Sequence, residues 1–476
     1  MFINSYNLPI YNYLKKYSEK KANIFHMPGH KLSKGIPYEL TQDILKLDIT
    51  EIYGSDNLHC PEGIIRDAQQ LAAQAFGAEH TFFLVNGSTC GVQAALLSVC
   101  QRDDVVLVSR DAHKSFLAAL ILSGARPVFI QPRFDESFYI SAEVSVNDIK
   151  NALDNYPEAK AVFLTRPNYY GICCDIQQIS NLVHSRGKVL IVDEAHGAHL
   201  GFCEQLPQSS IKLGADICIQ SAHKTLPALT QSAYLHVRGS RIDMEKLRFN
   251  LAMLQTSSPS YILMAFLDIA REIMQKEGGP RLDNLVANIT ILINDLHSNT
   301  SLCALTQDSL PRGIEHDITR LVINTRSSGL TGYEAEKLLR KSFNTYIEMS
   351  DYQNIVLIST IADDVISFSK LYTAMKEIDR QGRYNMPLKK QKIRTLRRAR
   401  VIMTPCETYY AKKETISLQN SCGRICASAI TPYPPGIPVI YPGEIFEEDT
   451  VEYLKNIIDA GGNVIGVTDG CVLVVS

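Results

Sequence analysis

The sequence predicts an α/β protein with a mostly parallel, seven-stranded sheet in a large domain, followed by a smaller α+β domain. The main observation is a series of continuous Val, Ile and Leu runs separated by stretches with helical spacing, which is typical of parallel strands buried on both faces. A second observation is the length of 476 residues, which exceeds the size at which one hydrophobic core stops growing. The predicted strands cover residues 81–85, 105–108, 127–131, 161–165, 189–193, 217–219 and 233–237.

Composition is that of an ordinary globular protein, with 45% hydrophobic and 21% charged residues. The 48 basic and 50 acidic residues give a formal charge of −2, which argues against general attraction to nucleic acid or an anionic membrane. The 12 cysteines show neither C-x-x-C pairs nor a small secreted framework, and residues 1–31 lack the apolar core of a signal peptide. No apolar run approaches a membrane-spanning length. We therefore expect a soluble cytoplasmic protein with reduced thiols and no nucleic-acid or membrane partner.

Three consecutive parts are expected along the chain. Residues 1–60 form an N-terminal arm, with a short helix over 11–20 and Pro/Gly turns at 28–29 and 35–37. Residues 61–290 form the large domain, which opens with a helix after Pro61-Glu62 that ends at Gly77. Residues 291–476 form the small domain.

The second half of the chain has four notable patterns. A helical region over 261–297 is expected to break at 278–280, where two glycines precede a proline. The small domain alternates strand-like segments (318–324, 346–348, 355–361) with helical ones (332–341, 365–378). Residues 389–400 hold seven cationic residues, which we interpret as a solvated linker or helix face rather than a polyanion site, because no aromatic residues interleave them. Thr468-Asp469-Gly470 predicts a hairpin turn between two short strands.

Lys224 is the first candidate functional residue. The segment Ser221-Ala222-His223-Lys224 lies between the apolar runs 217–219 and 232–237, so Lys224 is expected just past the carboxyl end of a strand. Ligands of open α/β sheets bind at that edge. Burial among apolar neighbours lowers a lysine pKa and favours the neutral amine, which can attack a carbonyl carbon. A lone loop lysine is usually an ordinary surface residue, so the neighbouring motifs must show whether Lys224 has a functional role.

Three further motifs supply complementary groups. Asp193 ends the strand at 189–193, and His113 follows the strand at 105–108 as a flat aromatic partner. Gly87-Ser88-Thr89 opens a helix, where free N–H groups and hydroxyls bind phosphate. A lysine for an aldehyde, a carboxylate for a pyridine nitrogen, a flat ring partner and a phosphate cup are what pyridoxal phosphate requires. The sequence therefore predicts this cofactor, with Lys224, Asp193 and His113 as catalytic residues and no metal.

Several longer motifs together resemble the bacterial ornithine/lysine/arginine decarboxylase family over nearly the whole chain. The resemblance implies the aspartate aminotransferase-like fold type I, with a family C-terminal motif region over about 390–476. The large inducible members carry a receiver-like domain before the arm, whereas this chain begins almost directly at His26, so it is similar to shorter biosynthetic members. The motifs are His26-Met27-Pro28-Gly29-His30-Lys31, Leu47-Asp48-Ile49-Thr50-Glu51, Asp56-Asn57-Leu58-His59-Cys60-Pro61-Glu62-Gly63, Ser221-Ala222-His223-Lys224 and Tyr433-Pro434-Pro435-Gly436-Ile437-Pro438.

The resemblance also implies binding roles around the cofactor. His196 would lie near it, although a position behind Asp193 is an equal alternative. Ser221 and His223 would face its phosphate. Thr256 and Ser257 would reach the phosphate held by a partner subunit, which implies a homodimer or higher homo-oligomer with shared sites. The alternative for the hydroxyl-rich loop is that it caps the following helix.

The expected reaction is decarboxylation of a basic amino acid to its amine and carbon dioxide, in polyamine biosynthesis, with arginine favoured over lysine or ornithine. Each of these substrates carries a distal positive charge, which needs a buried acid. Glu348 and Asp351 are the candidates, although both also suit solvated turn acids. Transamination or another lyase reaction stays open, with Arg424 as a possible grip on the substrate carboxylate. A non-enzymatic regulator is disfavoured, because no nucleic-acid-binding module is visible.

Overall fold

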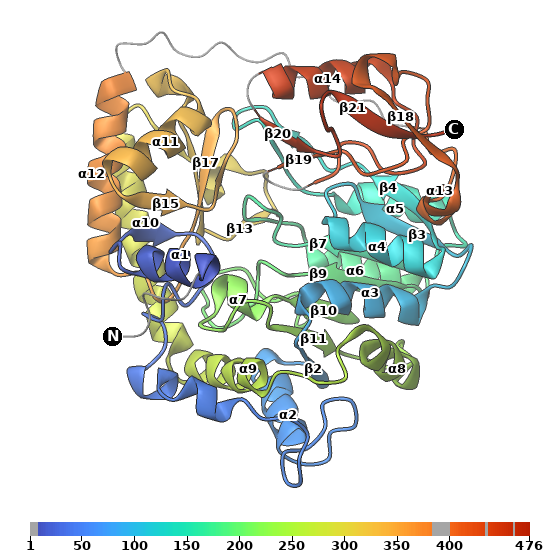
Figure 1. The fold of residues 1–476 in the computed structure, drawn as a ribbon, viewed down its shortest axis with the longest axis horizontal. Helices are drawn as coiled ribbons and strands as arrows, with labels where there is room; N and C mark the ends of the chain where they lie inside the picture. The colour runs from blue at the N-terminus through green and yellow to red at the C-terminus, as the bar shows by residue number, and fades with distance from the viewer. Residues whose placement is uncertain (1–7, 383–399, 434–436, 460–461) are drawn as a thin grey trace.

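The structure is a computed structural model that describes residues 8–382, 400–433, 437–459 and 462–476. Its centre is a seven-stranded sheet with the order β2-β11-β10-β9-β7-β3-β4 (Figure 1). Only β11 runs antiparallel to its neighbours, so the predicted mostly parallel sheet is confirmed. The strands are β2 (His80–Leu84), β3 (Val105–Ser109), β4 (Arg126–Ile130), β7 (Ala161–Thr165), β9 (Val189–Asp193), β10 (Ile217–Gln220) and β11 (Ala233–Val237).

Helices cover both faces of this sheet. One face packs against α3 (Gly87–Val99), α4 (Lys114–Ser123) and α8 (Met244–Leu254), and the other against α5 (Val146–Asn155) and α6 (Ile176–Ser185). Side chains of β3 alternate between the two cores, with Val106 and Val108 in the first and Val105 and Leu107 in the second. Burial on both faces explains why the strands are continuous apolar runs.

A smaller sheet follows, with the order β12-β14-β17-β16. It shares one hydrophobic core with the long helices beside it and with α2 (Ile64–Phe76) of the large domain. The predicted domain limit at 290 falls inside α10 (Gly279–Asn299), and the domain limits stay a prediction. The elements are β12 (Cys303–Ala304), β14 (Arg320–Asn324), α11 (Gly332–Ser342), β15 (Thr345–Ile347), β16 (Met349–Ser350), β17 (Asn354–Ile358) and α12 (Val365–Gly382); short strands elsewhere are β5 (Phe134–Asp135), β6 (Ile140–Ser141), β8 (Ile172–Cys173) and β13 (Glu315–His316).

The predicted break at 278–280 is wrong. α9 (Tyr261–Ile273) continues through a π-helical turn (Met274–Gly278) directly into α10. Pro280 falls in the first turn of α10, and the wider π-helical turn before it absorbs the missing N–H donor without interrupting the helix.

The chain from 400 onwards forms a separate hydrophobic cluster beside β3 and β4 (Figure 1). Asp469 and Gly470 have positive φ, as the predicted turn requires, and Thr468 bridges Cys471. The predicted turn is confirmed, because the backbones of Thr468 and Cys471 exchange hydrogen bonds of 3.0 and 2.9 Å across it, but the two strands that it joins pair with other strands and not with each other. β18 (Lys413–Ser417) pairs with β21 (Cys471–Val475), and β19 (Thr431–Tyr433) pairs with β20 (Asn463–Ile465); the helices are α13 (Pro405–Tyr410) and α14 (Glu448–Asp459).

Two predicted features fall on residues that are not described. The basic segment 389–400 lies outside the described residues except for Arg400, and the proline-rich motif at 433–438 lies partly outside them. Within the described part of the chain, no helix combines the length and the apolar character needed to cross a membrane.

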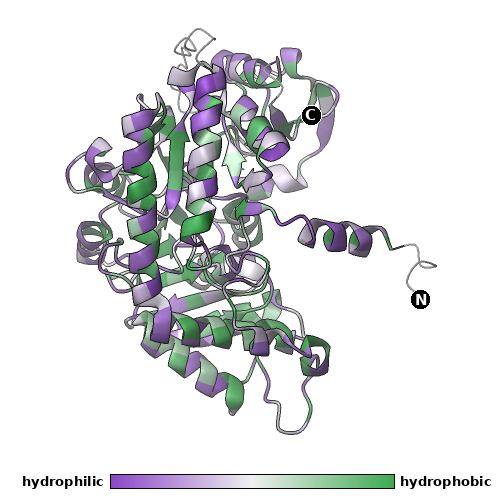
Figure 2. Cartoon of the chain, turned by 90° about the vertical axis from the view of Figure 1, so that its left-hand side faces the viewer, coloured by the Kyte–Doolittle hydropathy of each residue, from purple (hydrophilic) through white to green (hydrophobic). Residues whose placement is uncertain are grey.

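The N-terminal arm joins the small domain. α1 (Pro9–Ser18) has no buried residue and stands out from the body of the protein (Figure 2). After it, β1 (Asn23–Phe25) pairs in parallel with β15. Gly29 then packs against the Lys224 turn, where an added Cβ would lie 2.6 Å from the Leu226 carbonyl oxygen. Glycine is therefore required here, and the arm motif is explained by its contact with the predicted site.

Candidate active site

Lys224 and Asp193 lie at one edge of the large sheet. Lys224 is in the single helical turn α7 (Ala222–Thr225), which directly follows β10, and Asp193 ends β9. The two strands are parallel neighbours, with Ile219 in register with Asp193. The register therefore brings together two residues that are 31 positions apart in the sequence.

The Lys224 amine contacts an imidazole. Its Nζ lies 3.0 Å from His196 Nε2. Burial lowers the pKa of Lys224 to about 8, against the opposing effect of the Asp193 carboxylate. With this pKa about a tenth of the amine is neutral at pH 7 and about half at pH 8, and the neutral form is the one that attacks carbonyl carbons.

Asp193 is buried and has few partners. Among the described residues its carboxylate accepts one hydrogen bond, from the Ala195 backbone N–H at 3.1 Å. Burial raises its pKa, and the neighbouring Lys224 opposes that shift. The carboxylate can therefore stabilise a cationic partner at this edge.

Arg320 is a candidate site residue that the sequence patterns did not indicate. It opens β14, its side chain is fully buried, and its Nη2 donates to His196 Nδ1. Its Nε and Nη1 have no hydrogen-bond partner within the described part of the chain. A buried guanidinium with unpaired N–H groups is costly, so the site is suited to an anionic ligand. The only local signal was a cationic residue inside an apolar strand pattern.

His113 precedes α4 at the carboxyl end of β3 and caps that helix. Its Nδ1 accepts from the Ser115 backbone N–H at 3.2 Å, and burial lowers its pKa to about 4. The imidazole is therefore neutral at physiological pH, as a flat ring partner requires. The lysine charge at Lys224 is the second cause of this pKa shift, so the two side chains are close.

The C-terminal unit holds the loop that carries His113. The Arg110 guanidinium lies 4.6 Å from the ring centroids of both Phe129 and Tyr441, and it forms a bidentate ion pair with Glu444. Tyr441 also donates its hydroxyl to the Ala112 carbonyl oxygen at 3.1 Å. These contacts hold the Arg110 side chain and the Ala112 backbone, which lie three residues and one residue before His113.

The predicted phosphate cup forms at the start of α3. Gly87 has a φ of +74°, and no side chain caps the first turn, so its N–H groups are open. Ser221 Oγ donates to Ser88 Oγ at 2.8 Å, which joins the two predicted phosphate residues, and Thr89 is exposed beside them. His223 contacts the Ser232 carbonyl oxygen at 3.1 Å through Nδ1.

Thr256 and Ser257 lie on an exposed loop between α8 and α9. The structure does not bring them to Lys224. Ser260 rather than either residue caps α9, by accepting from the Leu263 backbone N–H. The Thr256 carbonyl oxygen accepts from His59 Nε2 at 2.9 Å. The capping alternative for this loop therefore applies to Ser260, whereas the Thr256 hydroxyl accepts from the Ser258 backbone N–H at 3.2 Å within the loop.

Glu348 and Asp351 meet different surroundings. Glu348 accepts from the Met27 backbone N–H and the Tyr169 hydroxyl, both at 3.1 Å, and its charge acts on Lys224. Asp351 instead accepts from the Gln353 and Asn354 backbone N–H groups of its own turn, at 2.8 and 2.9 Å. The structure places Glu348 in the site and gives Asp351 the bonding of a turn acid.

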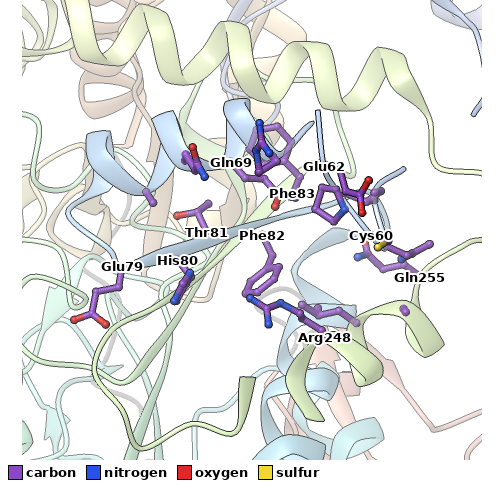
Figure 3. A pocket seen from close by; sticks show the side chains of 18 residues that line it. Cys60, Glu62, Gln69, Glu79, His80, Thr81, Phe82, Phe83, Arg248 and Gln255 are labelled. Carbon is purple, nitrogen blue, oxygen red and sulfur yellow. The ribbon is translucent and has the colours of Figure 1, made fainter. Parts of the chain in front are cut away.

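Two other features lie apart from Lys224. Arg424 pairs with Glu414 and donates to the Val475 carbonyl oxygen at 2.9 Å, within the C-terminal unit. A cavity of about 500 Å³ runs along the outer edge of β2 between α2 and α8 (Figure 3). Its walls include His80, Arg248 and Gln255, and none of the predicted cofactor or substrate residues lines it.

Solved structures define the class of the fold. The chain is similar to lysine decarboxylase A from Pseudomonas aeruginosa, with a TM-score of 0.79 and 21% identity over 98% of this chain and 80% of that one. It is also similar to ureidoglycine-glyoxylate aminotransferase from Bacillus subtilis, with a TM-score of 0.60 and 12% identity over 76% of this chain and 93% of that one. The fold is that of the fold type I pyridoxal phosphate enzymes, which include decarboxylases and aminotransferases.

Sequence comparison narrows the class to one family. Residues 8–318 match the family model "Orn/Lys/Arg decarboxylase, major domain", and residues 388–467 match "Orn/Lys/Arg decarboxylase, C-terminal domain". The arginine decarboxylase of Bacillus subtilis (strain 168) is 36% identical over 98% of this chain and 97% of its own length. The chain belongs to the Orn/Lys/Arg decarboxylase family.

Proposed function

We propose that this protein is a pyridoxal phosphate-dependent decarboxylase that converts a basic amino acid, preferably arginine, to its amine and carbon dioxide for polyamine synthesis. The observation that carries the proposal is the Lys224 amine at the sheet edge, beside the buried Asp193 carboxylate. Full-length relatives named arginine decarboxylase support both the reaction and the preferred substrate.

The residues present fit the cofactor. Pyridoxal phosphate, when bound, supplies an aldehyde carbon for an amine and a ring that withdraws the electron pair left when the carboxyl group departs. Lys224 would hold the aldehyde carbon, Asp193 the protonated ring nitrogen, and His113 one face of the ring. The open N–H groups of the first turn of α3 and the paired hydroxyls of Ser88 and Ser221 would bind the phosphate.

Lys224 and Asp193 would act in sequence. Lys224 would be freed when the substrate amine takes its place on the cofactor, and its position in α7, directly after β10, would keep the amine at the site. Asp193 stabilises positive charge on the ring nitrogen through the decarboxylation step. Lys224 would then supply a proton to the α-carbon, because burial places its pKa at about 8, close to physiological pH.

Glu348 would bind the distal charge of the substrate. Its carboxylate lies in the site, is half-buried, and is oriented by the Met27 N–H and the Tyr169 hydroxyl. A planar guanidinium can form two parallel hydrogen bonds to one carboxylate, which favours arginine. Asp351 is the weaker candidate, because its own turn already uses its oxygens.

Transamination is a second candidate, and Arg320 is the observation that favours it. The unpaired Nε and Nη1 of Arg320 fit an α-carboxylate. Such a grip stabilises the substrate carboxylate in the ground state, which suits a reaction that keeps the carboxylate better than one that removes it. The names of the full-length relatives favour decarboxylation.

The test is a substrate panel with two product assays. The protein is incubated with arginine, lysine and ornithine in the presence of pyridoxal phosphate, and carbon dioxide, amine and keto acid are measured separately. Carbon dioxide and amine in equal amounts, fastest with arginine and absent in Lys224→Ala, are expected. Keto acid without carbon dioxide would establish transamination and overturn the proposal.

We also propose a homodimer with shared sites, in which the Thr256 and Ser257 hydroxyls reach the cofactor of the partner subunit. Both residues are exposed and neither caps α9, and the neighbouring α8 exposes Phe249 and Met253. A Lys224→Ala chain mixed with a Thr256→Ala, Ser257→Ala chain should form hybrids with one intact site. Random exchange should then restore about a quarter of native activity. Activity equal to the average of the two parents would count against sharing.

A further inference from the structure

Three side chains at the site form one chain of hydrogen bonds. Arg320 Nη2 contacts His196 Nδ1, and His196 Nε2 lies 3.0 Å from Lys224 Nζ. Arg320 comes from β14 of the small sheet, His196 from the turn after β9, and Lys224 from α7. All three side chains have little or no solvent contact at the atoms involved, since the imidazole and the guanidinium are buried.

The chemistry of these groups allows one arrangement of protons. A guanidinium has five N–H donors and no acceptor, so the nitrogen that faces Arg320 must be the unprotonated one. A neutral imidazole carries one N–H, which must then be at Nε2. A proton at Nδ1 would place two donors face to face in a buried site. His196 Nε2–H therefore points at the Lys224 amine.

We infer that Arg320 is a positioning residue that fixes the tautomer of His196, and that His196 thereby donates Nε2–H to Lys224 and selects the neutral form of its amine. Only a neutral amine has the lone pair that can accept this hydrogen bond. The inference rests on the proposed function, because the neutral amine is the form that attacks the aldehyde carbon.

The other charged groups around Lys224 have mixed effects. Asp193 on β9 and Glu348 between β15 and β16 favour the ammonium, whereas burial and the Arg320 charge oppose it. His113 and His223 also face this cluster, and burial keeps both neutral by lowering their pKa values to about 4. Burial likewise lowers the pKa of His196 well below its usual value, with the Lys224 and Arg320 charges adding to the effect. The imidazole therefore remains neutral, as a single-proton tautomer requires.

The first test reads the tautomer directly in the native full chain. Nitrogen-15 NMR of histidine-labelled protein distinguishes protonated from unprotonated ring nitrogens, and comparison with His196→Gln identifies the His196 signals among the 12 histidines. The expected result is a protonated Nε2 and an unprotonated Nδ1. A protonated Nδ1, or an imidazolium, at pH 7 would overturn the inference.

The second test reads the amine of Lys224 in cofactor-free protein. The rate of modification by trinitrobenzenesulfonate, followed by mass spectrometry of the Lys224 peptide, measures the neutral fraction. Arg320→Met should lower that rate at pH 7 by about tenfold, equivalent to a pKa one unit higher. Arg320→Lys, which keeps a donor and a charge, should largely restore it.

A double-mutant cycle separates the tautomer from simple charge repulsion, because removing Arg320 raises the Lys224 pKa in either case. The Arg320→Met effect should shrink severalfold in a His196→Phe background, where only repulsion remains. An equal effect in both backgrounds would overturn the inference.

Internal controls are available. Lys212 donates to the Gly201 carbonyl oxygen and has its pKa lowered by burial, so its rate should be unchanged in every variant. Arg281→Met removes an arginine that contacts Glu277 and the Ile361 carbonyl oxygen instead, and should leave Lys224 unaffected. Neither readout requires turnover, so an inactive protein with the expected tautomer would contradict the proposed function alone.

Discussion

Asp193 and Glu194 are adjacent carboxylates at the end of β9, and they meet opposite surroundings. Asp193 faces Lys224 and accepts one hydrogen bond among the described residues. Glu194 is fully buried and forms an ion pair with Arg166. It also accepts hydrogen bonds from Ser209 Oγ, Ser210 N and Oγ, Cys218 Sγ and Gln220 Nε2.

Arg166 and Arg320, whose side chains are fully buried, repeat this contrast. Arg166 donates to the carbonyl oxygens of Cys174 and Gln208, and it contacts two glutamates, Glu194 and Glu315. Arg320 leaves Nε and Nη1 unpaired within the described chain. Proteins satisfy buried polar groups unless a ligand is expected to do so. The Glu194 side of β9 therefore serves folding, and the Asp193 side is left incomplete for a ligand.

The largest expected effect is on stability at Glu194. Glu194→Gln keeps the shape but removes the charge that faces Arg166, so the free energy of unfolding should fall by about 3–5 kcal/mol. Chemical denaturation measures the loss, and activity per folded molecule should stay near native. Glu315→Gln, at the half-exposed partner of Arg166, is the matched control and should cost less than about 1 kcal/mol. An inactive Glu194→Gln protein of native stability would contradict the conclusion that Glu194 serves folding.

The corresponding substitution at the other carboxylate of the pair is Asp193→Asn. An amide cannot hold a proton on the ring nitrogen, so the decarboxylation rate should fall by about 10²–10³-fold. Stability should be equal or higher, because burial raises the folded pKa of Asp193 and its stabilising contribution is already lost as pH rises towards neutrality. Steady-state rates and denaturation curves on one preparation check both parts. A rate within about tenfold of the parent would contradict the proposed role.

The stability of the protein should fall at acid pH because of buried groups connected to Glu194. His236 is fully buried between the Thr81 hydroxyl and Gln220 Oε1, and Gln220 in turn donates to Glu194. Burial lowers the pKa of His236 to about 3, whereas an unfolded histidine binds a proton near pH 6.5. Stability from this group is present above about pH 6.5 and is lost as pH falls, by at most about 1.4 kcal/mol per pH unit.

The measurement is the free energy of unfolding between pH 7 and pH 4. His236→Gln should flatten this dependence by nearly one proton, and His80→Gln, at an exposed histidine, should leave it unchanged. An identical slope in parent and His236→Gln would show that the group does not titrate on unfolding.

The smallest expected effect concerns the substrate end of the site. Glu348→Gln should raise KM for arginine by about tenfold, equivalent to one charge-assisted hydrogen bond of about 1.4 kcal/mol, and weaken the preference among basic amino acids. Asp351→Asn is the paired control and should change KM less, because its turn uses the carboxylate. Unchanged KM and preference in Glu348→Gln would remove Glu348 from the site.

Strand-end residues were predictable because their chemistry follows from local patterns. An apolar run long enough for one buried strand has a definite end, and in a parallel sheet all such ends share one edge. Lys224 and Asp193 were found in this way. The glycine turn that opens a helix at Gly87 was likewise visible from residue types alone.

Contacts between distant elements were not predictable. Arg320 is one of 48 basic residues, and nothing near it in the sequence indicates that its guanidinium would be fully buried. The contacts of Arg110 with Tyr441 and Glu444 join residues more than 300 positions apart. The turn at 468–470 was predicted correctly, but the pairing partners of the strands on either side of it were not predictable, since strand pairing depends on which segments the core brings alongside.

The sequence by itself determined the sheet, the residue types at its carboxyl edge and the family. These follow from short-range periodicity and from motifs whose chemistry is carried by neighbouring residues. Only the tertiary structure decided which of two adjacent carboxylates is satisfied, which arginine keeps unpaired N–H groups, and which nitrogen of His196 faces Lys224. Burial and hydrogen-bond partners determine these properties, and both come from segments that meet only when the chain has folded.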